Sequence, residues 1–227
     1  MSKIIQLNKK KKPICVAAII QARMTSSRFP DKSMAPLNGK PVLQHVIESC
    51  RKIVPINRVI VAVPDTDESE PLLELADWLK VDNFCGSELN VLNRYYEAAK
   101  LFNVDIIIRI SADCPMINPI VCTEILSLLM WKKLDYCSNV YPIRTYPKGL
   151  DCEVFTFDCL EAAHTLSDPL KPGDWEHVTP WMQRTKELKK ANVTQRNDVS
   201  EINLCIDYQE DLERVAKVCL KVETNDN

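Results

Sequence analysis

The sequence predicts an α/β fold built on a doubly wound, mostly parallel sheet. Apolar runs of strand length alternate with helical patterns over the first ~135 residues, which is the rhythm of such folds. These apolar runs are nearly continuous, as expected for strands that are covered on both faces. We expect a single domain over 14–222, preceded by a disordered basic tail over 1–13, with an irregular or antiparallel insertion at about 136–200.

Hydrophobic periodicity and capping residues place the individual elements. Strands are expected at 16–20, 58–63, 81–84, 105–110, 135–140, 152–157 and 203–206. Helices are expected at 41–51, 70–80, 91–102, 118–131, 174–184 and 211–222. A further short helix is expected to be capped by Asp158, and the helix over 174–184 is expected to continue through Pro180.

Composition and charge exclude several classes of protein. The net charge of −2 argues against a protein that coats nucleic acid, because such a binder is strongly basic. No apolar run approaches the ~18 residues of a membrane span. The ten cysteines contain no CxxC pair, which favours a reduced, cytoplasmic compartment over a disulfide framework. The basic-then-apolar order of 9–20 resembles a signal peptide, but no small-x-small cleavage site follows it.

The loop after the first expected strand is rich in cations and hydroxyl groups. Three cations, Arg23, Arg28 and Lys32, stand within ten residues. Three hydroxyl side chains lie among them, at Thr25, Ser26 and Ser27. Ligands of α/β proteins bind at the carboxyl ends of strands, where Arg side chains and backbone N–H groups supply counter-charge to phosphates. A phosphate site and a solvated basic loop are both compatible with this composition.

Glycine-based nucleotide motifs are absent from the sequence. The chain has four glycines, and neither GxGxxG nor GxxxxGK[ST] can be built from them. Any phosphate site must therefore use side-chain cations.

Two carboxylates follow apolar runs that we expect to be strands. Asp113 follows the run at 105–110, and Asp207 follows the run at 203–206. In a parallel sheet both would emerge at the same edge as the cationic loop. Two such carboxylates beside a polyphosphate suit Mg²⁺, a hard ion that binds one or two carboxylates together with phosphate oxygens. The alternative is that each aspartate caps a helix.

A third polar group lies in the irregular half of the chain. It comprises Ser138-Asn139, the stretch 148–153 with Lys148, Asp151 and Glu153, and Glu176-His177; the expected acceptor ligands are Asn139, Asp151, Glu153 and His177. Asp151 and Glu153 are two residues apart on an expected strand, so both side chains should face the same side. They could accept hydrogen bonds from the hydroxyl groups of a sugar, whereas an anionic acceptor would need compensation from Arg144 or Lys148. Ordinary loop polarity explains the group equally well.

The segment 20–32 reads Ile-Gln-Ala-Arg-Met-Thr-Ser-Ser-Arg-Phe-Pro-Asp-Lys and resembles the opening motif of the cytidylyltransferase superfamily. This superfamily activates sugars such as 3-deoxy-manno-octulosonate and acylneuraminate as CMP derivatives. The resemblance is closest to the branch of spore coat polysaccharide biosynthesis protein F, and it covers nearly all of 14–220. Further matching stretches are 86–87 with 91–95, 109–115, 149–155 with 176–180, and 206–212.

The resemblance implies a Rossmann-like nucleotidyltransferase fold of glycosyltransferase-A type. It also implies a Mg²⁺-dependent enzyme that transfers CMP from CTP to a sugar or sugar-acid acceptor, releases pyrophosphate and serves surface polysaccharide synthesis. The implied phosphate ligands are Arg23, Ser27, Arg28 and Lys32. Ala22 would meet the base through its backbone, Ser87 and Arg94 would line the nucleotide side, and Asp113 and Asp207 would bind Mg²⁺. The acceptor pocket, and part of a homodimer contact, are expected in the segment 139–177.

Two positions depart from the family pattern. Asp31 stands where the family usually has glycine, and Asn93 stands where this branch usually has aspartate. One alternative is a nucleotide-sugar-dependent glycosyltransferase, although that class normally shows Asp-x-Asp where this chain has Ala112-Asp113-Cys114. The second alternative is a degenerate family member that binds nucleotide without catalysing transfer.

Overall fold

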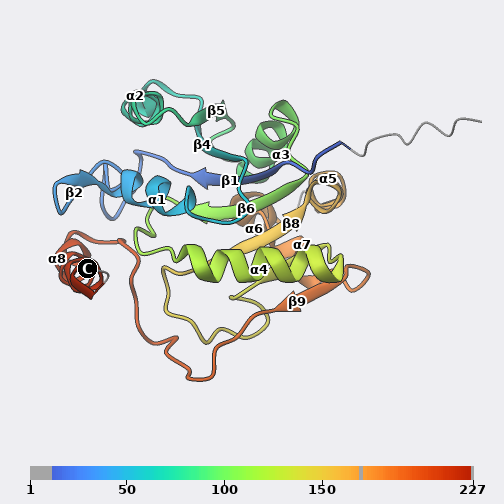
Figure 1. Ribbon diagram of the computed structural model, residues 1–227. Coiled ribbons are helices and arrows are strands. Elements are labelled where there is room, and N and C mark those ends of the chain that lie inside the picture. Colours follow the sequence, from blue (N-terminus) through green and yellow to red (C-terminus); the bar gives the residue numbers. More distant parts are fainter. Residues whose placement is uncertain (1–11, 169–170, 226–227) are drawn as a thin grey trace, which may run out of the picture.

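The computed structural model describes residues 12–168 and 171–225 (Figure 1). The expected basic tail lies almost wholly outside the described residues. Within them, one seven-stranded sheet has the strand order β5-β4-β1-β6-β8-β7-β9. Its strands are β1 (Val16–Gln21), β4 (Arg58–Pro64), β5 (Asp82–Gly86), β6 (Ile106–Ser111), β7 (Tyr136–Ser138), β8 (Glu153–Thr156) and β9 (Lys190–Asn192).

The two halves of the sheet differ in strand direction. β5, β4, β1 and β6 are all parallel, so their carboxyl ends share one edge. β8 runs antiparallel to both β6 and β7, and β9 is parallel to β7. The predicted mostly parallel α/β sheet with antiparallel strands in the later part is therefore confirmed.

Helices cover both faces of the sheet, because alternate residues of the central strands point to opposite sides. Ala18 and Ile20 of β1 belong to the core on one face, whereas Ala17 and Ile19 belong to the core on the other. The first face is covered by α1 (Val42–Cys50), α2 (Glu70–Trp78) and α4 (Pro119–Lys132). The second face is covered by α3 (Val91–Leu101), α5 (Phe157–Leu166), α6 (Pro172–His177) and α7 (Pro180–Arg184).

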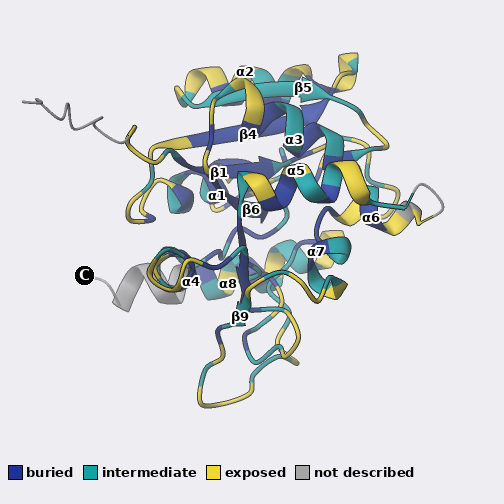
Figure 2. Cartoon of the chain, turned by 90° about the vertical axis from the view of Figure 1, so that its right-hand side faces the viewer, coloured by how far each residue is buried: buried dark blue, intermediate teal, exposed yellow. Residues whose placement is uncertain are grey.

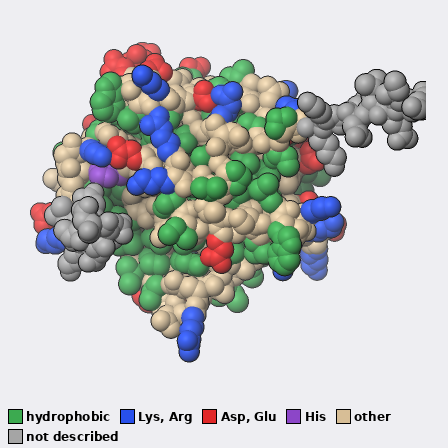
Figure 3. Space-filling view, in the orientation of Figure 1, with side chains coloured by type: hydrophobic (Ala, Val, Ile, Leu, Met, Phe, Trp, Pro, Cys, Tyr) green, Lys and Arg blue, Asp and Glu red, His purple; other side chains and the backbone are tan. Residues whose placement is uncertain are grey.

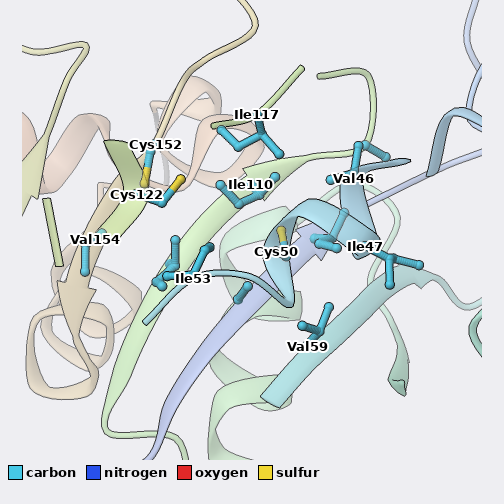
Figure 4. Packing of buried hydrophobic residues seen from close by; sticks show 14 of the residues in the cluster. Val46, Ile47, Cys50, Ile53, Val59, Ile110, Ile117, Cys122, Cys152 and Val154 are labelled. Atoms are coloured by element: carbon cyan, nitrogen blue, oxygen red, sulfur yellow. The ribbon is translucent and has the colours of Figure 1, made fainter. Parts of the chain in front are cut away.

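The central strands are almost wholly buried, as Figure 2 shows for β1, β4 and β6. In the core of the first face, Ile47 and Cys50 of α1 belong to one buried cluster with Ile110 of β6 (Figure 4). α4 is apolar on more than its core-facing side, and Ile120 and Trp131 are exposed on it. Hydrophobic side chains accordingly extend over the middle of the face shown in Figure 3. In the described part of the chain, no helix is both long and apolar enough to cross a membrane.

A hairpin and the last helix complete the fold beside the sheet. β2 (Pro36–Leu37) and β3 (Lys40–Pro41) are joined by Asn38 and Gly39, both of which have positive φ, as a tight hairpin turn requires. α8 (Gln209–Asn225) lies beside this hairpin (Figure 1), and its Val215 packs in one cluster with Leu37. A short 3-10 helix, η1 (Asp67–Ser69), precedes α2.

Two predicted elements are wrong. The segment 203–206 is not a strand of the sheet, because only Asn203 forms a bridge, with Lys148. The helix expected at 174–184 is broken between α6 and α7. Pro180 cannot donate a backbone hydrogen bond, and it begins α7 instead of continuing α6.

The cap of α5 also differs from the prediction. The side chain of Thr156 accepts the hydrogen bond from Cys159 N, so Thr156 is the cap and Asp158 lies in the first turn. β8 is mostly buried, because Val154 packs into the core on one face of the sheet and Phe155 into the core on the other. β9 and the β2–β3 hairpin were not predicted, since their strands have only two or three residues.

Candidate active site

A cavity of about 300 Å³ opens at the carboxyl ends of β1 and β6. Its walls come from the loop after β1, the start of α3, the end of β6 and the end of α6. The lining residues are Gln21, Ala22, Arg23, Ser26, Ser27, Arg28, Lys32, Ser33, Glu88, Val91, Arg94, Ser111, Ala112, Asp113, Glu176 and His177. The cavity therefore brings the cationic loop together with Asp113 and with one end of the irregular half.

Backbone hydrogen bonds fix the cationic loop at both of its ends. Ala22 N donates to Ala62 O of β4, which extends the sheet by one residue. Farther along, Asp31 N donates to Met24 O and Ser33 Oγ donates to Arg23 O. The loop thus folds back on itself, with Lys32 and Ser33 buried and Arg23 exposed at the cavity.

Lys32 lies between the two predicted metal-binding carboxylates. Its Nζ is 2.7 Å from Asp113 Oδ2 and 3.3 Å from Asp207 Oδ1, and it also donates to Ile206 O. Arg28 approaches the same Asp207 oxygen at 2.8 Å. Burial raises the pKa of Asp113, but the charge of Lys32 and its hydrogen bond outweigh burial, so the pKa lies below its ordinary value.

Asp207 reaches this position without a strand. Ile206 N donates to Asp113 O at 2.9 Å, which joins the two segments directly through their backbones. Gly149 packs against the same segment: a Cβ at this position would be 2.7 Å from the carbonyl carbon of Leu204. Loop packing, rather than sheet topology, therefore delivers Asp207 to Asp113.

The two carboxylates fit a shared hard cation. Both contact one ammonium group, so both present a carboxylate oxygen to the same positively charged centre. Among the described residues, no three His, Cys, Asp or Glu side chains form a metal-binding group. Mg²⁺ does not require one, because phosphate oxygens and water complete its shell.

Arg94 is a buried cation that faces the cavity without a counter-ion. It is 3% exposed, its Nη1 donates to Ser87 O at 3.1 Å, and its Nε has no partner. No ion pair of Arg94 occurs within the described ranges. Burial lowers its pKa; Tyr95 opposes this shift, and the nearby charge of Arg23 adds to it. A bound molecule with acceptor oxygens would satisfy this group.

The residues predicted to bind the acceptor are not all at the cavity. His177 lines it and so does its neighbour Glu176, but Asn139, Asp151 and Glu153 do not. Asn139 is fully buried; it donates to Leu150 O and accepts from Cys152 N.

The premise that Asp151 and Glu153 face one way along a strand is wrong, because β8 begins only at Glu153. Asp151 forms a two-pronged ion pair with Arg144. Glu153 is buried and accepts from Arg109 at 2.6 Å and from Tyr136 at 2.5 Å.

Several lining residues were not predicted. Gln21 and Ser111 are the last residues of β1 and β6, so the rule that ligands bind at strand ends could have identified both. The Oε1 atom of Gln21 is buried without a partner. Glu88 and Ser33 carry no comparable signal in the sequence.

The two departures from the family pattern have distinct surroundings. Asp31 has φ 59°, a left-handed conformation that glycine adopts freely and that aspartate tolerates better than most residues. Asn93 does not line the cavity; its Oδ1 is 2.9 Å from Nε2 of His164, which links α3 to α5.

A parallel sheet whose strand ends present a cationic, hydroxyl-rich loop opposite two carboxylates defines the class of phosphate-handling α/β enzymes. A family profile described as cytidylyltransferase matches residues 17–225. The chain belongs to the cytidylyltransferase family and is a nucleotidyltransferase.

Individual relatives agree with this assignment. The chain is 27% identical over 207 residues to the spore coat polysaccharide biosynthesis protein SpsF of Bacillus subtilis, a match that covers 87% of this chain and 83% of that protein. It is 33% identical to the 3-deoxy-manno-octulosonate cytidylyltransferase of Geobacter metallireducens, but over 51% of this chain and 44% of that enzyme. The solved structure of a cytidylyltransferase from Leptospira borgpetersenii superposes with a TM-score of 0.84 at 29% identity, covering 89% of this chain and 85% of that one.

Proposed function

We propose that the protein is a Mg²⁺-dependent cytidylyltransferase that transfers CMP from CTP to a sugar or sugar-acid acceptor and releases pyrophosphate. The observation that carries the proposal is the cluster in which Lys32 contacts both Asp113 and Asp207, with Arg28 on the same Asp207 oxygen. This cluster places two cations and two potential metal ligands beside a hydroxyl-rich loop. The names of the relatives support a sugar acceptor and a role in surface polysaccharide synthesis.

In this proposal the cationic loop binds the triphosphate. Arg23, Arg28 and Lys32 neutralise its charge, and Ser27 donates a hydrogen bond to a phosphate oxygen. Ala22 contacts the base through its backbone. Ser87, with the buried Arg94, holds the nucleoside side, where the Nε atom of Arg94 gains an acceptor.

The transfer step exchanges one bond for another at the α-phosphorus. An acceptor oxygen attacks the α-phosphorus in line, the bond from the α-phosphorus to the α,β-bridging oxygen breaks, and pyrophosphate leaves with that bridging oxygen. The chain contributes positioning and charge neutralisation, with no covalent intermediate. Asp113 and Asp207 would hold Mg²⁺, which when bound neutralises phosphate charge and acidifies an acceptor hydroxyl.

The cellular setting is part of the proposal. All ten cysteines lie in the described part of the chain and none is joined in a disulfide, which supports a reducing cytoplasm. Tyr141 and Ile143 expose 37% and 59% of their surface within the segment expected to form a homodimer contact, and this supports a dimer through that segment.

The test is pyrophosphate release from each of the four nucleoside triphosphates, with Mg²⁺ and a panel of neutral sugars and sugar acids that includes 3-deoxy-manno-octulosonate. Pyrophosphatase-coupled detection measures the rate, and mass spectrometry identifies the CMP ester. We expect release with CTP and at least one acceptor, with kcat/KM well above those for ATP and GTP. Comparable values for CTP and a purine nucleotide would refute the assignment. Consumption of a nucleotide sugar in place of CTP would instead indicate a glycosyltransferase.

A further inference from the structure

The connection between α6 and α7 is a strained turn centred on Val178. Val178 has φ 70° and ψ −50°, and Thr179 N donates to His177 O at 2.8 Å, which closes a three-residue γ-turn. The positive-φ form of this turn is rare, and a β-branched residue at positive φ is an outlier. The turn lies immediately after Glu176 and His177, the two residues through which α6 lines the cavity.

Packing holds Val178 in this conformation. Its side chain is fully buried in the cluster that contains Val91 and Tyr95 of α3, and α6 packs against that helix. Pro180 begins α7 directly after Thr179, so the backbone cannot relax by continuing α6. Strained backbone persists only where its surroundings over-determine it, and such positions concentrate at functional sites.

A buried polar network holds the same turn from the side of the sheet. Gln183 of α7 donates from its backbone N to Thr179 O and from its Nε2 to Thr179 Oγ1. The same Nε2 also donates to Glu153 Oε1 at 3.1 Å. Glu153 is fixed in turn by Arg109 of the central strand β6 and by Tyr136 of β7. Thr179, the last residue of the turn, is therefore tied to the middle of the sheet.

We propose that Val178 and Glu153 are positioning residues: the strained turn, held by the Glu153 network, fixes His177 and Glu176 as the acceptor-binding wall of the cavity. This inference rests on the proposed transfer to a sugar acceptor. An imidazole beside a carboxylate offers donors and acceptors for the hydroxyl groups of a polyhydroxylated molecule. Holding them rigidly lowers the entropy lost when that molecule binds.

The test compares Val178→Gly with Val178→Ala. Both variants lose the buried isopropyl group, but alanine keeps the Cβ that strains the turn, whereas glycine removes it and frees the backbone. We expect the urea midpoint of Val178→Gly to equal or exceed that of Val178→Ala, the reverse of the order at an unstrained position. We also expect the acceptor KM of the glycine variant to be about tenfold above that of the alanine variant, with the KM for CTP unchanged.

A second readout does not depend on activity. The chain has three histidines, so the imidazole NMR signals can be assigned with His177→Gln. We expect one sharp His177 signal in the wild type and in Val178→Ala, and a broadened or multiple signal in Val178→Gly. If the signals behave in this way but the wild type transfers no CMP, the proposed function fails and the positioning role stands.

Any one of three results would overturn the inference. These are a lower urea midpoint for Val178→Gly than for Val178→Ala, equal acceptor KM values in the two variants, and an unchanged His177 signal in Val178→Gly. Gln183→Met tests the network even if both Val178 variants fail to fold. It should raise the acceptor KM and broaden the His177 signal, whereas the matched Gln44→Met, which removes a bond to Glu48 on α1, should do neither. A Gln183→Met variant that leaves both readouts unchanged contradicts the inference equally.

Discussion

The two walls of the cavity are built by different means. One wall is the cationic loop with Asp113, and it stands at the carboxyl ends of two neighbouring parallel strands. The other contains Glu176 and His177, which are presented by a strained turn. Asp207 reaches the centre through loop packing against Gly149. Sheet topology places the first wall, whereas long-range packing places the second wall and Asp207.

Because of this difference, we expect the two walls to respond differently to substitution. Side-chain changes at the first wall should remove charge while leaving the backbone intact. Backbone changes in the irregular half should displace groups that are distant in sequence, because no strand holds them. Substitutions at the two walls separate these two kinds of effect.

Lys32→Met should have the largest effect. It leaves Asp113 and Asp207 facing each other without the shared ammonium group, and we expect unfolding free energy to fall by about 1–3 kcal/mol, because both carboxylates keep some contact with water. Turnover should fall by about 10²- to 10³-fold. Lys40→Met is the control: its exposed pair with Glu48 should contribute less than about 1 kcal/mol. Turnover of Lys32→Met within tenfold of the wild type contradicts the role of Lys32.

The same pair predicts a pH dependence of stability. The pKa of Asp113 lies below its ordinary value in the folded protein, so the pair stabilises the fold above about pH 4 and loses this contribution as the pH falls. Urea unfolding of the wild type and Lys32→Met should therefore differ most near neutral pH and converge on acidification. A constant difference down to pH 2 contradicts the pairing.

Gly149→Ala tests whether the contact of Gly149 with the segment before Asp207 positions that carboxylate. Gly149 and Gly39 both have positive φ, 99° and 82°, but a Cβ at Gly39 meets nothing within 4 Å, whereas at Gly149 it meets the backbone of Leu204 and Cys205. Both alanine variants should lose about 1–2 kcal/mol of stability, because a residue with a Cβ is disfavoured at positive φ. Only Gly149→Ala should also lower kcat, by about tenfold or more, through displacement of Asp207. Equal kcat values in the two variants would show that the contact does not position Asp207.

Asp31 should give the smallest effect. Asp31→Asn removes a carboxylate next to Lys32 but keeps a side chain that tolerates positive φ, whereas Asp31→Gly also relieves the backbone. Both variants should lower the KM for CTP by about two- to threefold, the size of a solvent-exposed charge effect. Only the glycine variant should gain stability, by a few tenths of a kcal/mol up to about 1 kcal/mol. An unchanged KM in both variants means that Asp31 does not affect the triphosphate.

The sequence predicts the first wall because it follows from strand order. The loop after β1 and Asp113 after β6 meet since the two strands are parallel neighbours, and a continuous apolar run identifies each strand. Asp207 was placed beside Asp113 on the premise of a strand at 203–206. Its position is right, but the premise is wrong, because a backbone hydrogen bond joins the two segments instead.

The second wall could not be read from local patterns. Glu153 resembles an accessible carboxylate in the sequence, yet Arg109, 44 residues away, neutralises it inside the fold. Asp151 is likewise engaged by Arg144. The turn at Val178 requires a conformation that valine disfavours, so propensity argues against it. Each of these features depends on contacts between segments that only the folded chain brings together.

The central claim is that Asp207, from the irregular half, joins Asp113 and the cationic loop in one active site. The most direct test is the turnover rate of the Asp207→Asn variant, measured across a Mg²⁺ titration with CTP and acceptor. The substitution keeps the shape of the side chain and removes its charge, and we expect kcat to fall by about 10²- to 10³-fold at every Mg²⁺ concentration while urea unfolding shows a folded protein. Asp198→Asn, an exposed aspartate of the same half, is the control and should retain wild-type turnover. Near-normal activity of Asp207→Asn throughout the titration would contradict the account.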